Sequence, residues 1–341
     1  MCDYEVSATR PAVRAAFPSL MVGAVVGGLF AVASSVPIAA QAVRFEPEQL
    51  AALEWRQIGP ASQGGRVTDI EALPSRPSTI YVGTASGGVF KSVNHGTTWV
   101  SVFDEQATLS IGDIAVSRSH PDHVWVGTGE ANNRNSSPWG EGVYRSTDGG
   151  VTWQLMGLEE TRHIGKVLIH PTNPNVVWVG ALGHLFGPNR ERGIYKTEDG
   201  GASWDKVFEI DENTGVVDME MDPSDPATIY AAAYQRQRRA YGFNGGGPGG
   251  GLYKSSDGGE SWTELTNGLP EGNKGRIGID VSQENPNIVM AIVEAEDGGI
   301  FRSEDRGESW TKVNALNPRP MYYSAMYMDP NDDEHVYVLV T

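Results

Sequence analysis

The sequence predicts an all-β fold, a β-propeller built from four-stranded blades. Three observations indicate it: five copies of one short motif, a nearly constant spacing between the copies, and short apolar segments between turn signals within each spacing. The motif runs Gly, an apolar residue, an aromatic, a basic residue, an Asp- and Gly-rich turn, and Trp. Its tryptophans, Trp99, Trp153, Trp204, Trp262 and Trp310, lie 54, 51, 58 and 48 residues apart. A period of about 50 residues with short strands is typical of propeller blades.

Each period divides into four strands, as the second copy shows. Residues 111–116 read as an inner strand, 124–127 as the second strand and 142–145 as the third, while the fourth begins at Trp153. Pro, Asp and Asn mark the turns between these segments, as strand-to-strand connections require. The same order recurs in the other copies, so we expect one blade per period.

The two ends of the repeat region predict an incomplete ring. Residues 54–58 read as a fourth strand with no motif before it, which would complete the last blade of a closed propeller. Residues 322–328 and 335–340 read as the first two strands of a sixth blade. We therefore expect a propeller over residues 66–341 with about five blades and the start of a sixth, cut from a longer chain, after an N-terminal segment of residues 43–65.

Residues 1–42 have the order of an export signal. Arg10 and Arg14 precede an uncharged, apolar run that ends at Ala40-Gln41-Ala42, and this small-residue site predicts cleavage after Ala42. The protein is then secreted or periplasmic. The apolar run is also long enough to span a bilayer, so an uncleaved signal would leave the protein anchored in the membrane.

Composition excludes several classes of protein. The chain carries 43 acidic and 26 basic residues, a net charge of −17, which argues against binding to the nucleic-acid backbone. Its single cysteine, Cys2, lies in the predicted signal, so the mature chain can form neither a disulfide nor a Cys-ligated metal site. The seven histidines show no metal-ligand spacing. We expect no cofactor and no metal.

The turn within the motif reads S-x-D-x-G-x-[ST]-W, complete in residues 146–153, 255–262 and 303–310. Its carboxylate can accept backbone N–H bonds, its glycine allows positive φ, and its Trp covers the blade edge. A propeller has one central site, which five equivalent peripheral turns cannot all serve, so we interpret the Asp position as structural. A lone carboxylate also falls far short of a calcium site. The five residues at this position are Asn94, Asp148, Asp199, Asp257 and Asp305.

This turn resembles the Asp box, or bacterial neuraminidase repeat, and the resemblance covers residues 66–341. Asp boxes occur in sialidases, in xyloglucan-active glycoside hydrolases, in the sortilin family of sorting receptors and in photosystem assembly factors. The chain looks most like bacterial sortilin-like or glycosyl-hydrolase-like repeat proteins. The resemblance implies the propeller, whereas function depends on the site that each such fold carries.

The resemblance also implies where catalytic groups would lie. In the xyloglucan-active hydrolases a catalytic Asp precedes the paired glycines before the third strand of the first blade, and here Ala85 stands at that place. Those enzymes draw their second carboxylate from a second propeller. Sialidases carry an Arg-Ile-Pro signature before the first box, and this sequence has none there.

Strand order predicts the face on which a ligand binds. If the motif turns join third to fourth strands on one face, the loops between second and third strands emerge on the opposite face. Three of these loops are long, residues 129–141, 183–192 and 234–251. Their aromatic, amide and guanidinium groups suit sugars and peptides equally, although such loops can also simply cover the propeller. The predicted ligand-binding residues are Arg66, Asn133, Arg134, Trp139, His163, His184, Tyr234 and Arg236.

Two function classes follow. A glycoside hydrolase needs two carboxyl groups across a cleft, and the candidates on the predicted loop face are Glu130, Glu141 and Asp69. None of them stands in a specific catalytic motif. We therefore expect a secreted recognition or scaffold module that binds a peptide, a protein, a glycan or further domains of a longer native chain. The alternative is a sialidase-like or xyloglucanase-like glycoside hydrolase whose catalytic pair lies partly in a C-terminal region beyond this sequence.

Overall fold

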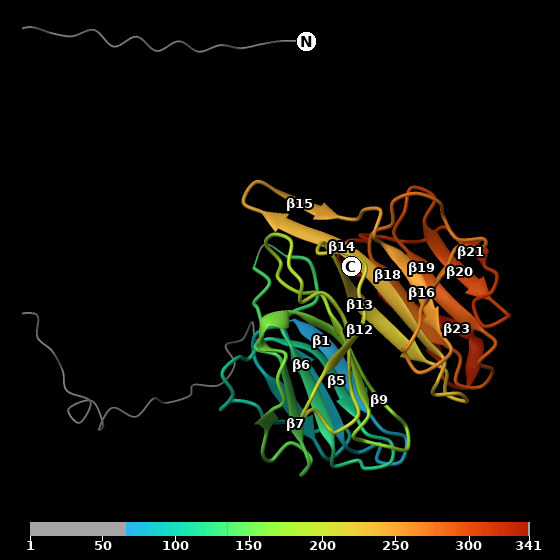
Figure 1. Ribbon diagram of the computed structural model, residues 1–341. Coiled ribbons are helices and arrows are strands. Elements are labelled where there is room, and N and C mark those ends of the chain that lie inside the picture. Colours follow the sequence, from blue (N-terminus) through green and yellow to red (C-terminus); the bar gives the residue numbers. More distant parts are fainter. Residues whose placement is uncertain (1–65, 135, 340–341) are drawn as a thin grey trace, which may run out of the picture. The chain divides into compact units, whose positions relative to one another are not determined.

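The computed structural model describes residues 66–134 and 136–339, and nearly all regular structure in them is β-strand (Figure 1). The predicted signal, residues 43–65 and the predicted ring-closing strand at 54–58 lie outside the described residues. Five four-stranded antiparallel blades follow one another along the chain. The predicted propeller of four-stranded blades is thereby confirmed.

Each blade is a meander in sequence order. Blade 1 contains β1 (Val67–Ala72), β2 (Ile80–Thr84), β3 (Val89–Ser92) and β4 (Val100–Ser101). Blade 2 contains β5 (Ile111–Val116), β6 (Val124–Thr128), β7 (Val143–Ser146) and β8 (Gln154–Leu155). Blade 3 contains β9 (Ile164–Ile169), β10 (Val177–Ala181), β11 (Gly193–Thr197) and β12 (Asp205–Phe208), after a single 3-10 turn at Glu159–Thr161.

The later blades keep this order with one addition. Blade 4 contains β13 (Thr214–Met221), β14 (Ile229–Arg239), β16 (Gly251–Ser255) and β17 (Thr263–Leu265), and β15 (Gly242–Gly245) pairs with the extended end of β14. Blade 5 contains β18 (Ile277–Val281), β19 (Val289–Val293), β20 (Gly299–Ser303) and β21 (Thr311–Asn314). A final pair, β22 (Met326–Asp329) and β23 (Asp332–Val338), forms at the two strands predicted for a sixth blade.

The β14–β15 hairpin departs from the sequence expectation. The sequence predicts a loop from residue 234 onward, but β14 continues to Arg239 and turns back into β15. Pairing runs from Arg236 opposite Gly245 to Arg239 opposite Gly242. Figure 1 shows the hairpin extending away from the rest of blade 4. A glycine-rich segment offers few side chains that signal a strand, so here backbone pairing alone decides the structure.

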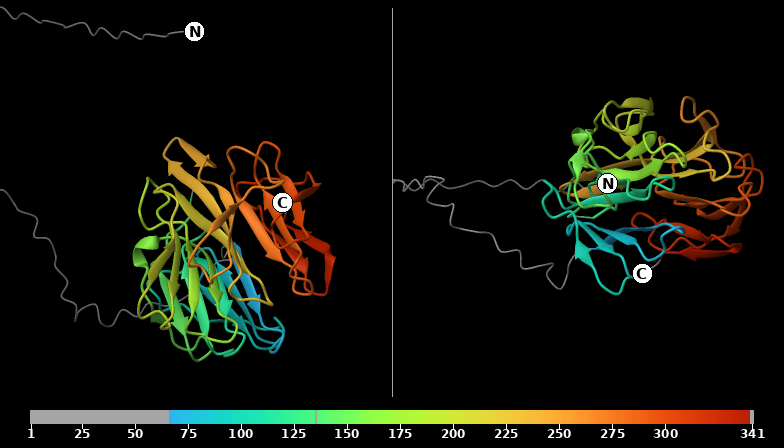
Figure 2. Two further views of the ribbon diagram at one scale, coloured as in Figure 1. Left: turned by 45° about the vertical axis from the view of Figure 1, so that its right-hand side comes forward. Right: turned by 90° about the horizontal axis from the view of Figure 1, so that it is seen from below.

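The apolar core lies in layers between adjacent blades. Inner strands of consecutive blades lie side by side, from β1 next to β5 through to β18 next to β22 (Figure 2). Between the first two blades, Tyr81 and Val89 pack with Ile114 and Val126. Every residue of β6 and of β10 is buried. Second strands are covered on both faces, which explains why they read as continuous small and apolar runs instead of alternating ones.

Each Asp-box turn is closed by its own side chains. Thr152 donates from its backbone N (2.9 Å) and its Oγ1 (2.6 Å) to the Asp148 carboxylate, and Ser146 Oγ donates to it as well (2.7 Å). These bonds, the one from Thr152 Oγ1 first, lower the pKa of Asp148 to about 2. Gly149 and Gly150 have φ of 71° and 90°, where a side chain is strained.

The same bonds recur around the turn in other blades. Asp199, Asp257 and Asp305 each accept a backbone N–H and a hydroxyl from the Ser four residues later. In blade 1, Asn94 Oδ1 accepts the backbone N–H of Thr98 at 2.9 Å. An amide oxygen therefore closes this turn as a carboxylate does.

The turn also joins its blade to the preceding one. Gly149 O in blade 2 accepts hydrogen bonds from Lys91 Nζ (2.7 Å) and Tyr81 Oη (3.0 Å) of blade 1. Gly200 O in blade 3 accepts one from Arg145 Nη1 (3.1 Å) of blade 2. Lys91 and Arg145 are the basic residues of the repeated motif. Their repetition follows from this contact, because each must reach the turn of the next blade.

Replacement of Asp148 tests the structural role of the turn. Asp148→Ala removes the four hydrogen bonds that the carboxylate accepts from Ser146, Val151 and Thr152, and should lower the free energy of unfolding at pH 7 by about 1 kcal/mol, roughly 2 °C in Tm. Asp148→Asn, which imitates Asn94, should cost less. Because the folded-state pKa of Asp148 is lowered to about 2, its ionised form stabilises the fold above the unfolded pKa near 4, and this contribution disappears as pH falls toward 2. The penalty of Asp148→Ala should therefore shrink in thermal unfolding curves below pH 4, and a constant or growing penalty would contradict the assignment.

Candidate functional site

The Asp-box turns and the long loops lie on opposite faces of the propeller. In three successive blades the turn is bonded to the connection between the first and second strands: Gly149 N to Asp122 O (2.8 Å), Gly200 N to Asn175 O (2.9 Å) and Gly258 N to Ala227 O (2.8 Å). We call this end the box face. In an antiparallel meander the loops between second and third strands then emerge at the other end, which we call the loop face.

A cavity of about 310 Å³ lies on the loop face. We call it the rim pocket. Three chain segments form it: the loop between β6 and β7, the connection into β9 and the loop between β10 and β11. Its lining residues are Ser137, Trp139, Arg162, His163, His184, Leu185 and Phe186. Three predicted ligand-binding residues, Trp139, His163 and His184, are thus brought together, and none of the lining residues is a carboxylate.

Two aromatic side chains dominate the open side of the rim pocket. Trp139 is 64% exposed and Phe186 is 60% exposed, although the fold buries most other large apolar side chains. Trp139 belongs to blade 2 and Phe186 to blade 3, so neighbouring blades supply the two rings. Exposed aromatic groups beside a cavity are typical of a binding surface.

Close backbone contacts hold the loops that line the rim pocket. Gly140 N donates to Arg162 O (2.7 Å), which fastens the β6–β7 loop to the connection into β9. Gly129 has φ of 91°, and a Cβ there would lie 2.0 Å from the same carbonyl oxygen. In the next loop, Asn189 Nδ2 donates to His184 O (3.3 Å) and Arg192 Nη2 donates to the same oxygen (2.7 Å). The pocket therefore has a fixed frame.

His163 forms the buried floor of the rim pocket. Its side chain is 2% exposed, and Nδ1 lies 3.2 Å from Gly183 O. Among the described residues, Nε2 has no hydrogen-bond partner. Burial, followed by the positive charge of Arg236, lowers the pKa of His163 well below its ordinary value, so the imidazole is neutral at neutral pH.

Three other predicted ligand-binding residues lie beneath the surface. Asn133, Tyr234 and Arg236 are all buried. Arg236 Nη1 donates to Ala131 O (2.6 Å) and to Asn133 Oδ1 (3.0 Å), while Asn133 Nδ2 donates to Tyr234 Oη and to Met321 O (2.9 Å). Their contacts fasten the β6–β7 loop to β14, so they support the loop face from within.

The remaining predicted residues of the loop face divide between two environments. Arg66 Nε and Nη2 donate to the two carboxylate oxygens of Glu130 (2.9 and 2.5 Å), and Glu130 is fully buried. Both oxygens of this catalytic candidate are thus engaged. Arg134 is exposed, with its guanidinium 5.8 Å from the Tyr322 ring centroid. Glu141 is partly exposed at the end of the β6–β7 loop, outside the lining of the rim pocket.

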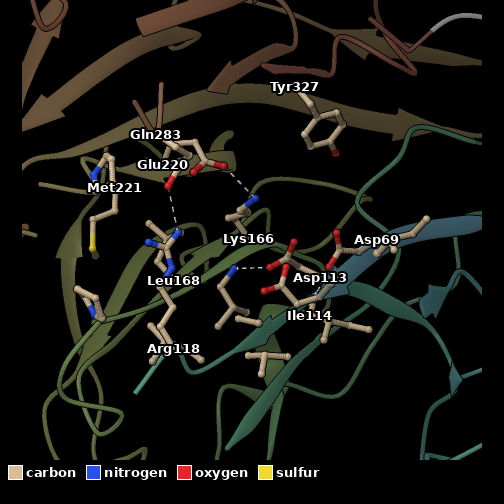
Figure 3. Close-up of a pocket in the computed structure, with 18 of the residues that line it drawn as sticks. Asp69, Asp113, Ile114, Arg118, Lys166, Leu168, Glu220, Met221, Gln283 and Tyr327 are labelled. Atoms are coloured by element: carbon tan, nitrogen blue, oxygen red, sulfur yellow. Dashed lines mark hydrogen bonds and ion pairs between the residues drawn. The ribbon is translucent and has the colours of Figure 1, made fainter. Parts of the chain in front are cut away.

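A second cavity, of about 320 Å³, lies in the central channel between inner strands (Figure 3). Residues of the connections between first and second strands, Arg118 and Pro223 among them, also line it, which places it toward the box face. Figure 3 shows Asp69, Asp113 and Glu220 around the Lys166 ammonium, which lies 3.1 Å from Glu220 Oε1. No set of three His, Cys, Asp or Glu side chains in the described ranges is grouped as a metal ion would require.

Channel aspartates link each inner strand to the next. Asp69 Oδ2 accepts the backbone N–H of Ile114 (2.9 Å), and Asp113 Oδ2 accepts that of Val167 (2.8 Å). Similar bonds run from Ile279 N to Asp218 (3.0 Å) and from Met328 N to Asp280 (2.6 Å). Asp69, the third catalytic candidate, therefore connects blade 1 to blade 2.

Sequence reasoning missed most of the channel. Asp113, Lys166, Asp218 and Glu220 were not among the predicted site residues, although the sequence contains a signal for them. Asp69 and Asp113 each stand directly before an isoleucine in an inner strand, and they pair with Gly83 and Gly127 of the second strand. Lys166 occupies the matching place in blade 3, where it pairs with Gly180. Alignment of the repeats by these pairings would have placed one ionisable residue per blade around the axis.

Burial shifts the titration of the channel carboxyl groups. It raises the pKa of Glu71 to about 8, of Glu220 to about 7 and of Asp280 to about 6, each against the partial compensation of Lys166. It also raises the pKa of Asp113 well above its ordinary value. The folded channel therefore binds more protons than the unfolded chain does between about pH 4.5 and pH 8.

This proton uptake predicts that the fold loses stability as pH rises. Glu71 has a higher pKa in the folded state than in the unfolded chain, so it favours the fold fully below its unfolded pKa near 4.5. This contribution is lost as pH rises through its folded pKa of about 8. Tm should fall from pH 5 to pH 8.5, and Glu71→Gln should flatten the profile and raise Tm at pH 8.5. Glu284→Gln, an exposed change near the channel mouth, is the matched control. Parallel profiles for wild type and Glu71→Gln would contradict this account.

The described residues include no helix with the length and apolarity that crossing a bilayer requires.

Comparison with known families finds one match, to the model of sortilin, neurotensin receptor 3 (Sortilin-Vps10), over residues 141–269. That segment contains three of the five Asp-box turns and two of the three loops that bear on the rim pocket. It covers less than half of the chain.

Curated relatives are xyloglucanases. The oligoxyloglucan-reducing end-specific xyloglucanase of Emericella nidulans is 26% identical over 226 residues, 61% of this chain and 25% of that enzyme. The xyloglucanase of a Paenibacillus species is 25% identical over 240 residues, 64% of this chain and 22% of that enzyme. This chain thus spans about a quarter of the length of the relatives it matches.

Solved structures agree on the fold. A GH74 enzyme from Niastella koreensis superposes with a TM-score of 0.60 at 20% identity, over 80% of this chain and 43% of that enzyme. An ancestral GH74 enzyme gives a TM-score of 0.61 at 21% identity, over 82% of this chain and 35% of that enzyme. At these identities the likeness concerns the fold alone. By sequence and architecture, this chain is an Asp-box β-propeller that resembles the sortilin Vps10 domain and the xyloglucanases.

Proposed function

We propose that this protein acts on a polysaccharide as a glycoside hydrolase of the xyloglucanase kind, and that its propeller binds the glycan on the loop face. The observation that carries the proposal is the rim pocket, in which exposed Trp139 and Phe186 of neighbouring blades line one cavity together with the polar side chains of Ser137, His163 and His184. Similarity to xyloglucanases favours a glycan over other ligands for such a surface.

The chemistry of the rim pocket suits a sugar ring. A pyranose presents apolar C–H groups on its faces and hydroxyl groups around its edge. Trp139 and Phe186 offer flat apolar surfaces for those faces, while Ser137, His163 and His184 offer hydrogen-bonding groups for the edge. A volume of about 310 Å³ matches the lower end of small-ligand pockets, which fits one or two sugar rings of a longer chain.

Hydrolysis requires two carboxyl groups that flank the glycosidic bond. Of the three candidates, Glu130 is held by Arg66 and Asp69 links two inner strands, so both already have structural partners. Glu141, two residues after Trp139 and partly exposed, is the candidate that these contacts leave available on the loop face. We propose Glu141 as one member of the catalytic pair of the whole protein.

A peptide or protein ligand is the second candidate, which the Sortilin-Vps10 match over residues 141–269 favours. The lining of the rim pocket contains no carboxylate. Its residues all lie outside the strands, so they offer no strand edge with which a peptide could pair. We therefore rank the glycan first. Export, which the sequence predicts from residues 1–42, would bring the propeller to a polymer outside the cell, and we propose it as part of the same function.

Glycan binding is tested by removing the two aromatic rings. Trp139→Ala and Phe186→Ala should each weaken binding of xyloglucan about tenfold, which corresponds to about 1.4 kcal/mol, because each ring loses its contact with a sugar face. Val151→Ala, at an exposed apolar residue on the box face, should leave binding unchanged. Affinity electrophoresis and calorimetry with xyloglucan, a cellulose-type β-glucan and a sialylated glycan measure the effect. Binding of peptides but of none of these glycans would favour the second candidate.

Hydrolysis is tested by reducing-end release from the same panel of polysaccharides. Glu141→Gln should lower the rate at least about 100-fold, because the amide can neither donate nor accept the proton that bond cleavage needs. Glu271→Gln, an exposed change in a connection between blades, should have no effect. Unchanged release by Glu141→Gln would remove this residue from the catalytic pair, and absence of release together with retained binding would reduce the proposal to glycan recognition.

A further inference from the structure

His163 lines the rim pocket and carries a buried polar atom without a partner in the described part of the chain. The side chain is 2% exposed and lines the cavity of about 310 Å³. Nε2 has no hydrogen-bond partner among the described residues. Leaving a buried polar atom unpaired costs about 1–3 kcal/mol, so native proteins keep few of them without a reason. Because His163 lines the rim pocket, a bound ligand is the partner to which this unpaired atom points.

The partner of the other ring nitrogen fixes the hydrogen-bonding role of Nε2. Nδ1 lies 3.2 Å from Gly183 O, and a carbonyl oxygen can only accept, so Nδ1 carries the proton and donates. In a neutral imidazole the second nitrogen then has a free lone pair. Nε2 is therefore an acceptor, and its natural partner is a group that donates an O–H or an N–H.

Burial, and then the charged groups around His163, keep its imidazole neutral. Arg236 projects from β14, Arg192 and His184 belong to the β10–β11 loop, and all three disfavour the imidazolium form. Arg192 Nη2 donates to Arg236 O (3.1 Å) as well as to His184 O, so its guanidinium is fixed in place. With burial these groups hold the pKa of His163 well below its ordinary value of 6.5. The acceptor role therefore persists into mildly acid solution.

We propose that His163 Nε2 accepts a hydrogen bond from a hydroxyl group of the bound glycan, and that the rim pocket thereby selects neutral sugar residues over acidic ones. This inference rests on the proposed glycan-binding function and names the atom that gives it specificity. A ring held between Trp139 and Phe186 would direct an edge hydroxyl to Nε2. A carboxylate at the same place offers no proton, and a site built to pair with a hydroxyl rejects groups that lack one.

His163→Phe tests the proposal, since the ring keeps its shape and loses its acceptor. We expect the affinity for a xyloglucan oligosaccharide to fall about tenfold. The thermal stability of the free protein should change little, because phenylalanine gives up the Nδ1 bond to Gly183 O (3.2 Å) but also removes the unpaired Nε2. His335→Phe, an exposed change on β23, is the control and should leave binding unchanged. Unchanged affinity in His163→Phe would overturn the proposal.

The pH profile of binding supplies an independent readout. Protonation of Nε2 removes the acceptor, but the pKa of His163 lies well below its ordinary value of 6.5, so wild-type affinity should stay constant through pH 6.5 and fall only in more acid solution, and His163→Phe should lose this acid fall. Nitrogen-15 NMR of the imidazole should show Nε2 unprotonated in the free protein and shifted when the oligosaccharide binds. This spectrum uses the wild-type chain, and it decides the question even where His163→Phe does not fold.

The outcomes separate this proposal from the function on which it rests. If wild-type protein binds no glycan of any kind, the proposed function fails. If it binds xyloglucan oligosaccharides but the Nε2 resonance and the pH profile do not respond, His163 is a structural residue and only the present inference fails. Tighter binding of a uronic-acid oligosaccharide than of a neutral one of equal length would also overturn it.

Discussion

The fold depends on one contact that repeats from blade to blade: in blades 2 to 5, a carbonyl oxygen of the Asp-box turn accepts a hydrogen bond from a side chain of the preceding blade. Gly149 O receives Lys91 and Tyr81, and Gly200 O receives Arg145. A four-stranded sheet buries apolar groups on both faces and cannot stand alone in water. The contact holds each blade against the preceding one, so that the apolar side chains of the two blades pack together between them.

The contacts that join the blades lie at the box face and in the channel, so the loop face is available to bind a ligand. The box face is occupied by the turns and their bonds to first-to-second strand connections, and the channel aspartates are occupied by backbone N–H groups of the next inner strand. The loops between second and third strands carry none of these links. They are instead held from beneath by Asn133 and Arg236, which permits Trp139 and Phe186 to remain exposed. Rigid support with exposed aromatic groups is what a binding surface requires.

The channel cavity and the rim pocket differ in the charge of the side chains that line them. The channel gathers carboxyl groups around Lys166, and burial there raises the pKa of Glu71 to about 8 and of Glu220 to about 7. The rim pocket is lined by neutral and basic side chains only, in a chain whose net charge is −17. Because burial, and then the basic groups near His163, lower its pKa, the imidazole is a neutral acceptor and not a cation, which suits a sugar hydroxyl.

The sequence by itself determined the repeat, the strand order, the Asp-box turns and the face that carries the long loops, because these follow from local periodicity and turn chemistry within one blade. It did not determine which loop residues are buried: Asn133, Tyr234 and Arg236 belong to the predicted ligand set, yet the tertiary structure places them inside. Nor did it reveal the β14–β15 hairpin or the Lys166 cluster. The buried loop residues and the Lys166 cluster depend on segments that lie one or more blades apart, about 50 residues or more along the chain, and only packing brings such segments together. The hairpin is local, but its glycine-rich sequence carries little strand signal.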